Sequence, residues 1–354
     1  MPVTRDDVAR AAGVSVATVS YVLNGGPRGV SAEKRARVLR AVADLGYRPN
    51  AIARSLRARR TRILGLVLPD SANPYFASLS HAIEEAAAGR GYQVVLANAA
   101  ERPDREAAHI EALLRLQVDG LFWIPADLRS ADRPGQPAPA PPPVPTVQLD
   151  RSLLRGESNG PQRLAVDVVE SDNVAGGRLA AEHLIALGHR RLACLAGPAG
   201  HLHARARLQG FRNALQALRS DDAPPALIAH GDFGYASGAA IAARWCALPA
   251  PRRPTGIVCG NDAMAIGALC AIAGAGLAVP GDLSIVGYDD LPQAPFSVPP
   301  LTTVAQPLHE LAAVAVERLL ARIEAPARAP EPAHILLPVR LVVRGSTGPP
   351  PLAP

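Results

Sequence analysis

The sequence predicts an α/β protein with a small all-helical domain at its N-terminus. Three observations support this fold class. The first 47 residues contain three helical patterns, each preceded by a capping residue and followed by a glycine. From Arg62 onward, apolar runs of strand length alternate with helical stretches, which is typical of doubly wound parallel sheets with helices on both faces. The two regions also differ in charge, because residues 1–62 carry a net charge of +9 and the remainder −3.

The first two helical patterns are joined at Gly13 in the manner of a helix-turn-helix motif. This stretch, from Thr4 to Asn24, reads Thr-Arg-Asp-Asp-Val-Ala-Arg-Ala-Ala-Gly-Val-Ser-Val-Ala-Thr-Val-Ser-Tyr-Val-Leu-Asn. A helix that begins with small residues can bring its backbone close to the major groove of DNA. Short polar side chains suit phosphate contacts, and those present here are Ser15, Thr18, Ser20 and Asn24. The alternatives are a purely structural three-helix bundle and, for the charge excess, a solvated basic tail.

The domain boundaries follow from these patterns. We expect a headpiece over residues 1–49 and a basic hinge over residues 50–60, which as an isolated helix would be marginal in water. The α/β region, 61–348, contains a faint repeat in which Ala88–Ala97 and Ala186–Leu195 both end a helix and enter a strand. It therefore predicts two lobes with a cleft at the carboxyl ends of their strands. We assign lobe 1 to about 61–165 plus 292–325, and lobe 2 to about 166–291 plus 326–348.

Composition limits the class of protein. The chain has 354 residues, of which 48% are hydrophobic and 19% charged, as in globular proteins. The first ten residues contain no apolar segment, so we expect no signal peptide. No run of 18 apolar residues occurs in the sequence, so we expect no membrane span. The four cysteines are scattered, which favours a reduced, cytoplasmic protein. Seven prolines between 134 and 145 predict an extended linker, or alternatively a protein-docking segment.

Several common motifs of enzymes are missing from the sequence. There is no HExxH, GxxxxGK[ST] or GxGxxG pattern, and we predict no enzyme activity and no cofactor. His201 and His203 have no further ligand nearby in the sequence, so we predict no metal site.

Three motifs together resemble the lactose-repressor (LacI) and purine-repressor family. They are Ala-Gly-Val-Ser-x-x-Thr-Val-Ser ending at Ser20, Gly-Tyr-Arg-Pro-Asn ending at Asn50, and Val-Gly-Tyr-Asp-Asp ending at Asp290. The resemblance covers nearly the whole chain. It implies a periplasmic-binding-protein-like body and a transcriptional repressor whose affinity for its operator is controlled by a sugar, nucleoside or base in the cleft.

The resemblance also implies the residues that contact DNA. Val16, Ala17 and Tyr21 would face base edges, and Leu56 of the hinge would wedge into a minor-groove step and kink the duplex. Because two hinges meet at the operator centre, a homodimer on a near-palindromic DNA is implied. The full predicted DNA-binding set is Thr4, Ser15, Val16, Ala17, Thr18, Ser20, Tyr21, Asn24, Asn50, Ala53, Arg54 and Leu56.

A second set is implied for the effector. Arg205 corresponds to the family's ligand-binding arginine, while Asn261 and Asp289 correspond to an amide and a carboxylate that bind hydroxyls or ring nitrogens. The apolar walls are expected to be Tyr75, Phe76 and Phe233, and the further polar candidates are Ser71, Asn73, Asp150 and Asp232.

Several alternatives remain open at this level. The regulator could respond to a protein corepressor, or it could bind DNA without any ligand. A third alternative is a ligand-binding protein without a DNA-binding role, such as a sugar receptor, but the basic headpiece argues against it. The C-terminal sequence Gly345–Pro354 is rich in proline and lacks leucine heptads, which favours a dimer over a tetramer. The sequence does not specify which compound is the effector, or whether this compound acts as an inducer or as a corepressor. Nor does it specify the operator sequence or the role of the proline-rich segment.

Overall fold

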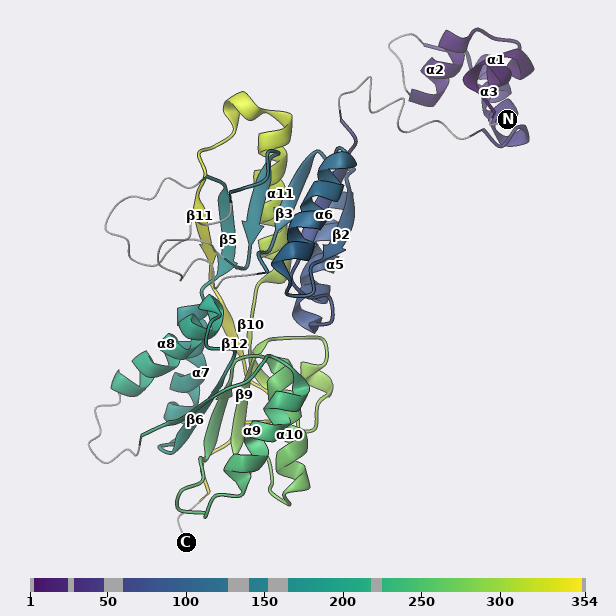
Figure 1. Cartoon of the computed structure of the whole chain (residues 1–354). Helices are drawn as coiled ribbons and strands as arrows, with labels where there is room; N and C mark the ends of the chain where they lie inside the picture. Colours follow the sequence, from purple (N-terminus) through teal and green to yellow (C-terminus); the bar gives the residue numbers. More distant parts are fainter. Residues whose placement is uncertain are drawn as a thin grey trace. The chain divides into compact units, whose positions relative to one another are not determined.

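The computed structural model describes residues 3–24, 29–47, 60–126, 140–151, 165–217 and 225–351. The chain divides into two compact units, Met1–Thr61 and Arg62–Pro354. The first contains helices and the second contains two lobes, each with its own sheet (Figure 1).

Three short helices form the N-terminal unit. They are α1 (Arg5–Ala12), α2 (Val16–Asn24) and α3 (Ala32–Asp44). Thr4 and Asp7 form a reciprocal capping box at the start of α1, and Gly13 ends this helix in the left-handed conformation, with φ at 61°. The sharp turn predicted at Gly13 therefore lies between α1 and α2.

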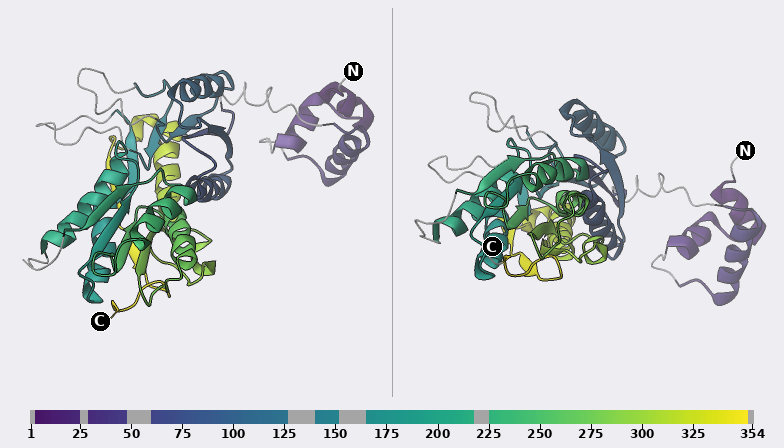
Figure 2. Two further views of the ribbon diagram at one scale, coloured as in Figure 1. Left: turned by 60° about the horizontal axis from the view of Figure 1, so that its bottom comes forward. Right: turned by 90° about the horizontal axis from the view of Figure 1, so that it is seen from below.

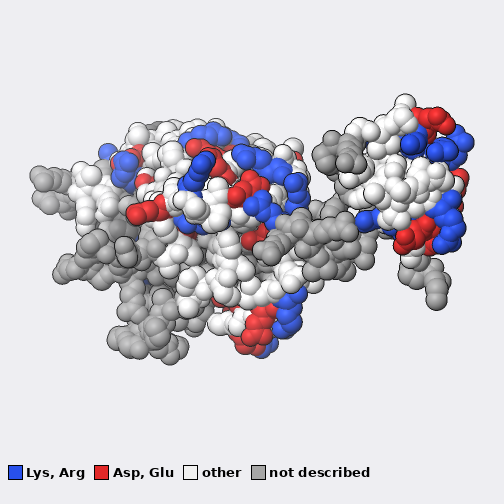
Figure 3. Space-filling view, turned by 90° about the horizontal axis from the view of Figure 1, so that it is seen from above, with Lys and Arg blue, Asp and Glu red and all other residues white. Residues whose placement is uncertain are grey.

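A small apolar core holds these helices together. Each helix contributes a stripe of small aliphatic residues, in keeping with the spacing of valines and alanines in the sequence. The core members are Val8, Ala9, Ala12, Val19, Val22, Val38, Ala41 and Tyr47. Charged side chains remain at the surface of the unit, where basic and acidic groups lie beside one another (Figure 3).

The first lobe contains a six-stranded sheet in which every pair is parallel. Its order is β11-β5-β4-β3-β1-β2. The strands are β1 (Ile63–Leu68), β2 (Gln93–Asn98), β3 (Gly120–Trp123), β4 (Thr146–Leu149), β5 (Asp167–Ser171) and β11 (His334–Leu337). Helices α5 (Pro74–Ala88) and α11 (Leu308–Glu324) pack on one face, and α6 (Pro103–Arg115) packs on the other.

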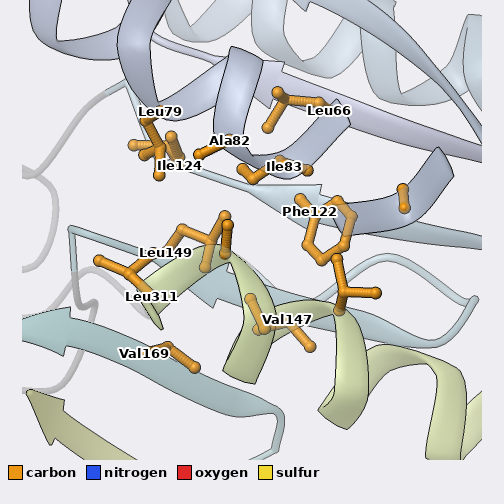
Figure 4. Packing of buried hydrophobic residues seen from close by; sticks show 14 of the residues in the cluster. Leu66, Leu79, Ala82, Ile83, Phe122, Ile124, Val147, Leu149, Val169 and Leu311 are labelled. Carbon is orange, nitrogen blue, oxygen red and sulfur yellow. The ribbon is translucent and has the colours of Figure 1, made fainter. Parts of the chain in front are cut away.

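The main core of this lobe lies between the sheet and the α5–α11 pair. Leu66, Phe122 and Val147 from the strands meet Ile83 and Leu311 from the helices (Figure 4). These side chains are fully buried, so truncating a leucine here to alanine should cost about 2–5 kcal/mol of stability. The packed core provides a rigid support for the loops at the carboxyl ends of the strands.

The second lobe repeats this architecture with one antiparallel edge. Its sheet has the order β12-β10-β9-β8-β6-β7, and β12 runs antiparallel to β10. The strands are β6 (Leu192–Ala196), β7 (Leu227–His230), β8 (Gly256–Cys259), β9 (Ser284–Asp289), β10 (Thr302–Ala305) and β12 (Arg340–Val342). Helices α7 (Asn173–Ala186) and α8 (Leu202–Ala217) cover one face, while α9 (Tyr235–Cys246) and α10 (Asp262–Gly274) cover the other (Figure 2). Short 3-10 turns lie at Ala294–Phe296 and Pro326–Arg328.

The chain passes between the lobes three times, and this corrects the predicted lobe boundaries. Strands β5 and β11 were expected in lobe 2 but pair in the first sheet, and β10 was expected in lobe 1 but pairs in the second. The crossovers follow β5, β10 and β11, and each spans a few residues. The error arose because strand and helix alternate in the same way in both lobes, so local patterns do not reveal which sheet a strand joins.

Candidate functional site

A cavity lies between the lobes, where the carboxyl ends of strands from both sheets meet. It encloses about 330 Å³ of space that protein atoms leave empty, part of it open to solvent. The first lobe contributes Asn73, Tyr75, Phe76, Asp150 and Arg151, and the second contributes His203, Arg207, Phe233, Asn261 and Asp289. This is the location expected for ligands in doubly wound sheets.

Arg207 of α8 is a cation of the cavity that is held at two of its nitrogens. Its Nε donates to Asn173 Oδ1 at 2.7 Å, and its Nη1 donates to the Gly260 carbonyl oxygen at 2.5 Å. Nη1 also lies 3.7 Å from Asp289 Oδ1. Among the described residues, none accepts a hydrogen bond from Nη2. The guanidinium is thus fixed at two nitrogens, and the third is available to a ligand.

A chain of hydrogen bonds links acidic groups on the two sides of the cavity. Tyr75 Oη donates to Asp150 Oδ1 at 2.7 Å and lies 3.5 Å from Gln306 Oε1. Gln306 Nε2 donates to Asp289 Oδ1 at 2.8 Å. Burial raises the pKa of Asp289 to about 7, although the Arg207 guanidinium and the Gln306 amide oppose this rise. Burial and the Asp150 carboxylate raise the pKa of Tyr75 well above its usual value, so its hydroxyl stays protonated and donates.

Arg151 supplies a second guanidinium from the first lobe. Its Nη2 and Nη1 donate to the two carboxylate oxygens of Glu101 at 2.8 and 3.0 Å, and Nη1 donates to the Pro125 carbonyl oxygen at 3.2 Å. The guanidinium lies 5.3 Å from the centroid of the Phe76 ring. Bidentate pairing of this kind orients the planar group as well as neutralising it.

Two lining residues connect the lobes directly. His203 Nε2 lies 2.8 Å from the Asp150 carbonyl oxygen, and both side chains are almost fully buried.

Three residues of the cavity have unusual backbone angles. Asp150 has a φ of 57°, and Phe233 and Asp289 have φ values of 70° and 120°. Non-glycine residues rarely adopt such angles, and strained backbone of this kind is concentrated at functional sites.

Most of the predicted effector residues meet in this cavity. The seven that line it are Asn73, Tyr75, Phe76, Asp150, Phe233, Asn261 and Asp289. The Asn261 amide also has a structural role, because its Oδ1 accepts from Met264 N at 2.9 Å and its Nδ2 donates to the Phe233 carbonyl oxygen at 2.9 Å.

Three predicted residues lie elsewhere. Arg205 is exposed, because it is two residues from Arg207 and so faces the opposite side of α8. Ser71 is exposed, with its backbone nitrogen donating to Asn98 Oδ1 at 3.1 Å. Asp232 is an exposed turn residue whose Oδ1 accepts from Gly234 N at 2.8 Å.

Four residues of the site escaped the sequence-based prediction. They are Arg151, His203, Arg207 and Gln306. Arg151 and Gln306 each follow a strand closely, so a search for polar residues at strand carboxyl ends would have found them. His203 and Arg207 are one turn apart on α8, and the helical phase needed to select them is not evident without the structure.

The N-terminal unit presents the predicted DNA-contacting face along α2. Ser15, Val16 and Ala17 are exposed, and Tyr21 is half-buried one turn later. Thr18 N donates to Ser15 Oγ at 3.2 Å. The predicted contacts Asn50, Ala53, Arg54 and Leu56 lie outside the described residues, as does the side chain of Asn24.

The described residues contain neither a cluster of metal ligands nor a helix suited to cross a membrane. No group of three or more His, Cys, Asp or Glu side chains in this part of the chain is placed to hold a metal ion. Within the same residues, no helix has the length and apolar character needed to cross a membrane.

Comparisons with known proteins match both units. Residues 4–50 match the family described as bacterial regulatory proteins, lacI family, and residues 181–347 match a periplasmic binding protein-like domain. The ribose operon repressor of Escherichia coli K12 is 38% identical over 323 residues, covering 91% of this chain and 94% of the relative.

Solved structures agree with this assignment. The lac repressor dimer bound to operator and an anti-inducer has a TM-score of 0.79 and 32% identity, covering 98% of this chain and all of that one. A LacI family transcriptional regulator from Enterococcus faecium with bound ribose has a TM-score of 0.65 and 29% identity, covering 81% of this chain and 99% of that one. From the helix-turn-helix unit, the two-lobed body and these relatives together, the chain belongs to the LacI family of bacterial regulatory proteins.

Proposed function

We propose that this protein is a cytoplasmic transcriptional repressor whose operator binding is controlled by a pentose sugar of the ribose class, and that it has no enzymatic activity. The observation that carries the proposal is the donor and acceptor set between the lobes. Two guanidinium groups, Arg151 and Arg207, and two carboxylates, Asp150 and Asp289, line a cavity together with aromatic rings. The relatives named for ribose support the same class of ligand.

The chemistry of a pentose matches this set. Each hydroxyl both donates and accepts, so a guanidinium donor and a carboxylate acceptor within reach can satisfy it. The Arg207 Nη2 would donate to ring or hydroxyl oxygens, while Asp289 would accept from hydroxyls. Phe76 and Phe233 would cover the apolar C–H faces of the sugar. A purine base has fewer polar groups than the cavity offers.

The DNA-binding role is assigned to the N-terminal unit. Helix α2 carries no charged residue, so its exposed residues are suited to reading base edges. The proposed contacts are Ser15, which directly precedes this helix, and Val16, Ala17 and Tyr21 within it. The basic residues Lys34, Arg35, Arg37 and Arg40 on α3 and the residues of the 50–60 segment would provide the positive charge that attracts phosphates. A homodimer on a near-palindromic operator is proposed, as in the lac repressor complex.

The proposal is tested by measuring both ligands on one preparation. D-ribose, D-xylose, D-glucose, adenosine and hypoxanthine are screened by thermal shift, because a ligand that binds the native state raises its Tm. Binding of operator DNA is then followed by fluorescence anisotropy with and without the compound that binds. We expect D-ribose to bind and to change operator affinity. A response to hypoxanthine alone, or ribose binding without any effect on DNA binding, would contradict the proposal.

A further inference from the structure

Arg207 is stacked on the ring of Tyr288. The central carbon of the guanidinium lies 3.7 Å from the ring centroid, well inside the ~6 Å range of cation–π contacts. Both partners are withdrawn from water, since the Arg207 side chain is 10% exposed and Tyr288 is 1% exposed. Removal from water strengthens a cation–π contact, so this pair belongs to the strong class.

The second lobe leaves room for this stacked pair by means of glycines. Tyr288 lies on β9 and packs beneath α7 and α8. A Cβ at Gly176 of α7 would lie 2.4 Å from the Tyr288 hydroxyl, and one at Gly177 would lie 1.9 Å from the Arg207 carbonyl oxygen. Real side chains do not tolerate such distances, so these two glycines allow α7 to approach both members of the pair.

The hydroxyl of Tyr288 takes no part in the contact. Its oxygen is buried, and within the described part of the chain it has no hydrogen-bond partner, which is an unfavourable state for a buried hydroxyl. Burial also raises the pKa of Tyr288, so the group stays neutral. The ring face is therefore the part of this residue that acts on the arginine.

We propose that Tyr288 is a positioning residue for effector binding, whose ring face sets the plane of the Arg207 guanidinium and so directs Nη2 into the cavity. Asn173 Oδ1 and the Gly260 carbonyl oxygen hold Nε and Nη1, and the ring supports the plane from one side. The inference rests on the proposed function, because D-ribose serves as the probe of effector affinity.

The test weakens the ring's electrostatic attraction while keeping its shape. Phenylalanine or a trifluorinated phenylalanine is placed at position 288, and D-ribose binding is measured by calorimetry. Tyr288→Phe should keep the affinity within about twofold and raise the Tm, because the unpaired hydroxyl is removed. The fluorinated ring should lower affinity by on the order of tenfold, and Tyr288→Leu by on the order of 30-fold. Equal affinities for the plain and fluorinated rings would overturn the proposal.

Two controls separate positioning from general loss of structure. Phe211→Leu removes another fully buried aromatic of the same cluster, and it should lower the Tm without changing ribose affinity. In an Arg207→Ala background, Tyr288→Leu should cause no further loss of affinity, since the two residues act as one unit. Additive losses in this double variant would mean that Tyr288 acts independently of Arg207.

A ligand-free measurement distinguishes failure of this inference from failure of the proposed function. The Arg207 Nε–Hε NMR signal, assigned by its loss in Arg207→Lys, reports order and ring current in the free protein. We expect reduced order in the Tyr288→Leu variant and retained order in Tyr288→Phe, whether or not ribose proves to be the ligand. Unchanged order in Tyr288→Leu would refute the positioning role, whereas absence of ribose binding to the wild type would refute the proposed effector.

Discussion

Two arginines on α8 provide a sharp test of the effector site. Arg207 lines the cavity, while Arg205 is exposed on the opposite side of the helix. Each would be replaced by alanine in the full-length protein. Because both variants lose one positive charge from the same helix, a difference between them reports position and not charge.

The expected effect can be worked out from the contacts of Arg207. Its Nη2 is the donor that the protein leaves for a ligand, and a hydrogen bond to a charged group contributes about 1.5–3 kcal/mol. Removing the guanidinium also leaves Asp289 buried without the cation 3.7 Å away, which raises the cost of holding that carboxylate next to a ligand. We expect a loss of ribose affinity on the order of 100- to 1000-fold for Arg207→Ala, and less than about twofold for Arg205→Ala.

Calorimetric titration with D-ribose gives both values directly. Arg207→Lys should fall between wild type and Arg207→Ala, since lysine keeps the charge but not the planar fork that bonds Asn173 and Gly260. Comparable losses in the two alanine variants would refute the reasoning, because they would place the critical cation on the exposed side of α8. Ribose binding by Arg207→Ala with undiminished affinity would refute it as well.

Three further predictions concern pH, the contact between lobes and the N-terminal unit. The folded-state pKa of Asp289, about 7, exceeds its usual 3.8, so the free energy of unfolding should fall as pH rises from about 4 to 7, by up to about 1.4 kcal/mol per unit. Melts between pH 5 and 8 should show a flatter dependence in Asp289→Asn, and an unaltered slope would contradict the assignment. His203→Ala removes the 2.8 Å contact with Asp150. This variant should bind ribose several-fold more weakly and should show a larger radius of gyration by X-ray scattering. If neither quantity changes, the His203 contact does not hold the two lobes together. A chain starting at Arg62 should bind ribose like the full protein and lose operator binding, and retained DNA affinity would locate the DNA contacts elsewhere.

Local patterns in the sequence were sufficient to predict the helical unit and the α/β alternation. Capping residues such as Thr4 and the glycine at position 13 act within a few residues of themselves, so their consequences can be read locally. The location of Asp150 and Asp289 at strand carboxyl ends, and of Tyr75 at the start of the helix that follows β1, agrees with the same alternation together with the family resemblance. These inferences depend on short-range chemistry and on parallel strand topology.

Long-range pairing was beyond the reach of such reasoning. Whether β5 joins β4 or β6 depends on contacts between segments distant in sequence, and a strand carries no local mark of its sheet. The side of α8 on which a residue lies was equally hard to predict from the sequence. Arg205 and Arg207 have identical chemistry and differ in orientation alone. The pairing of Arg151 with Glu101, 50 residues away, likewise required the three-dimensional fold.

Gln306 lies where a ligand in the cavity would act on the connection between the lobes. This residue lies on the crossover from β10 to α11, where it donates to Asp289 in lobe 2 and lies 3.5 Å from Tyr75 in lobe 1. A ligand hydroxyl bound to Asp289 Oδ1 would compete with the Gln306 amide for this oxygen, and would so act on a segment that connects the two lobes. Lobe 1 is also continuous with the N-terminal unit through Arg62, whose backbone nitrogen donates to Asp119 Oδ2 at 2.9 Å. A ligand that favours one lobe arrangement would therefore act on the lobe to which the DNA-binding unit is attached, and reciprocity requires operator binding to shift effector affinity by the same factor.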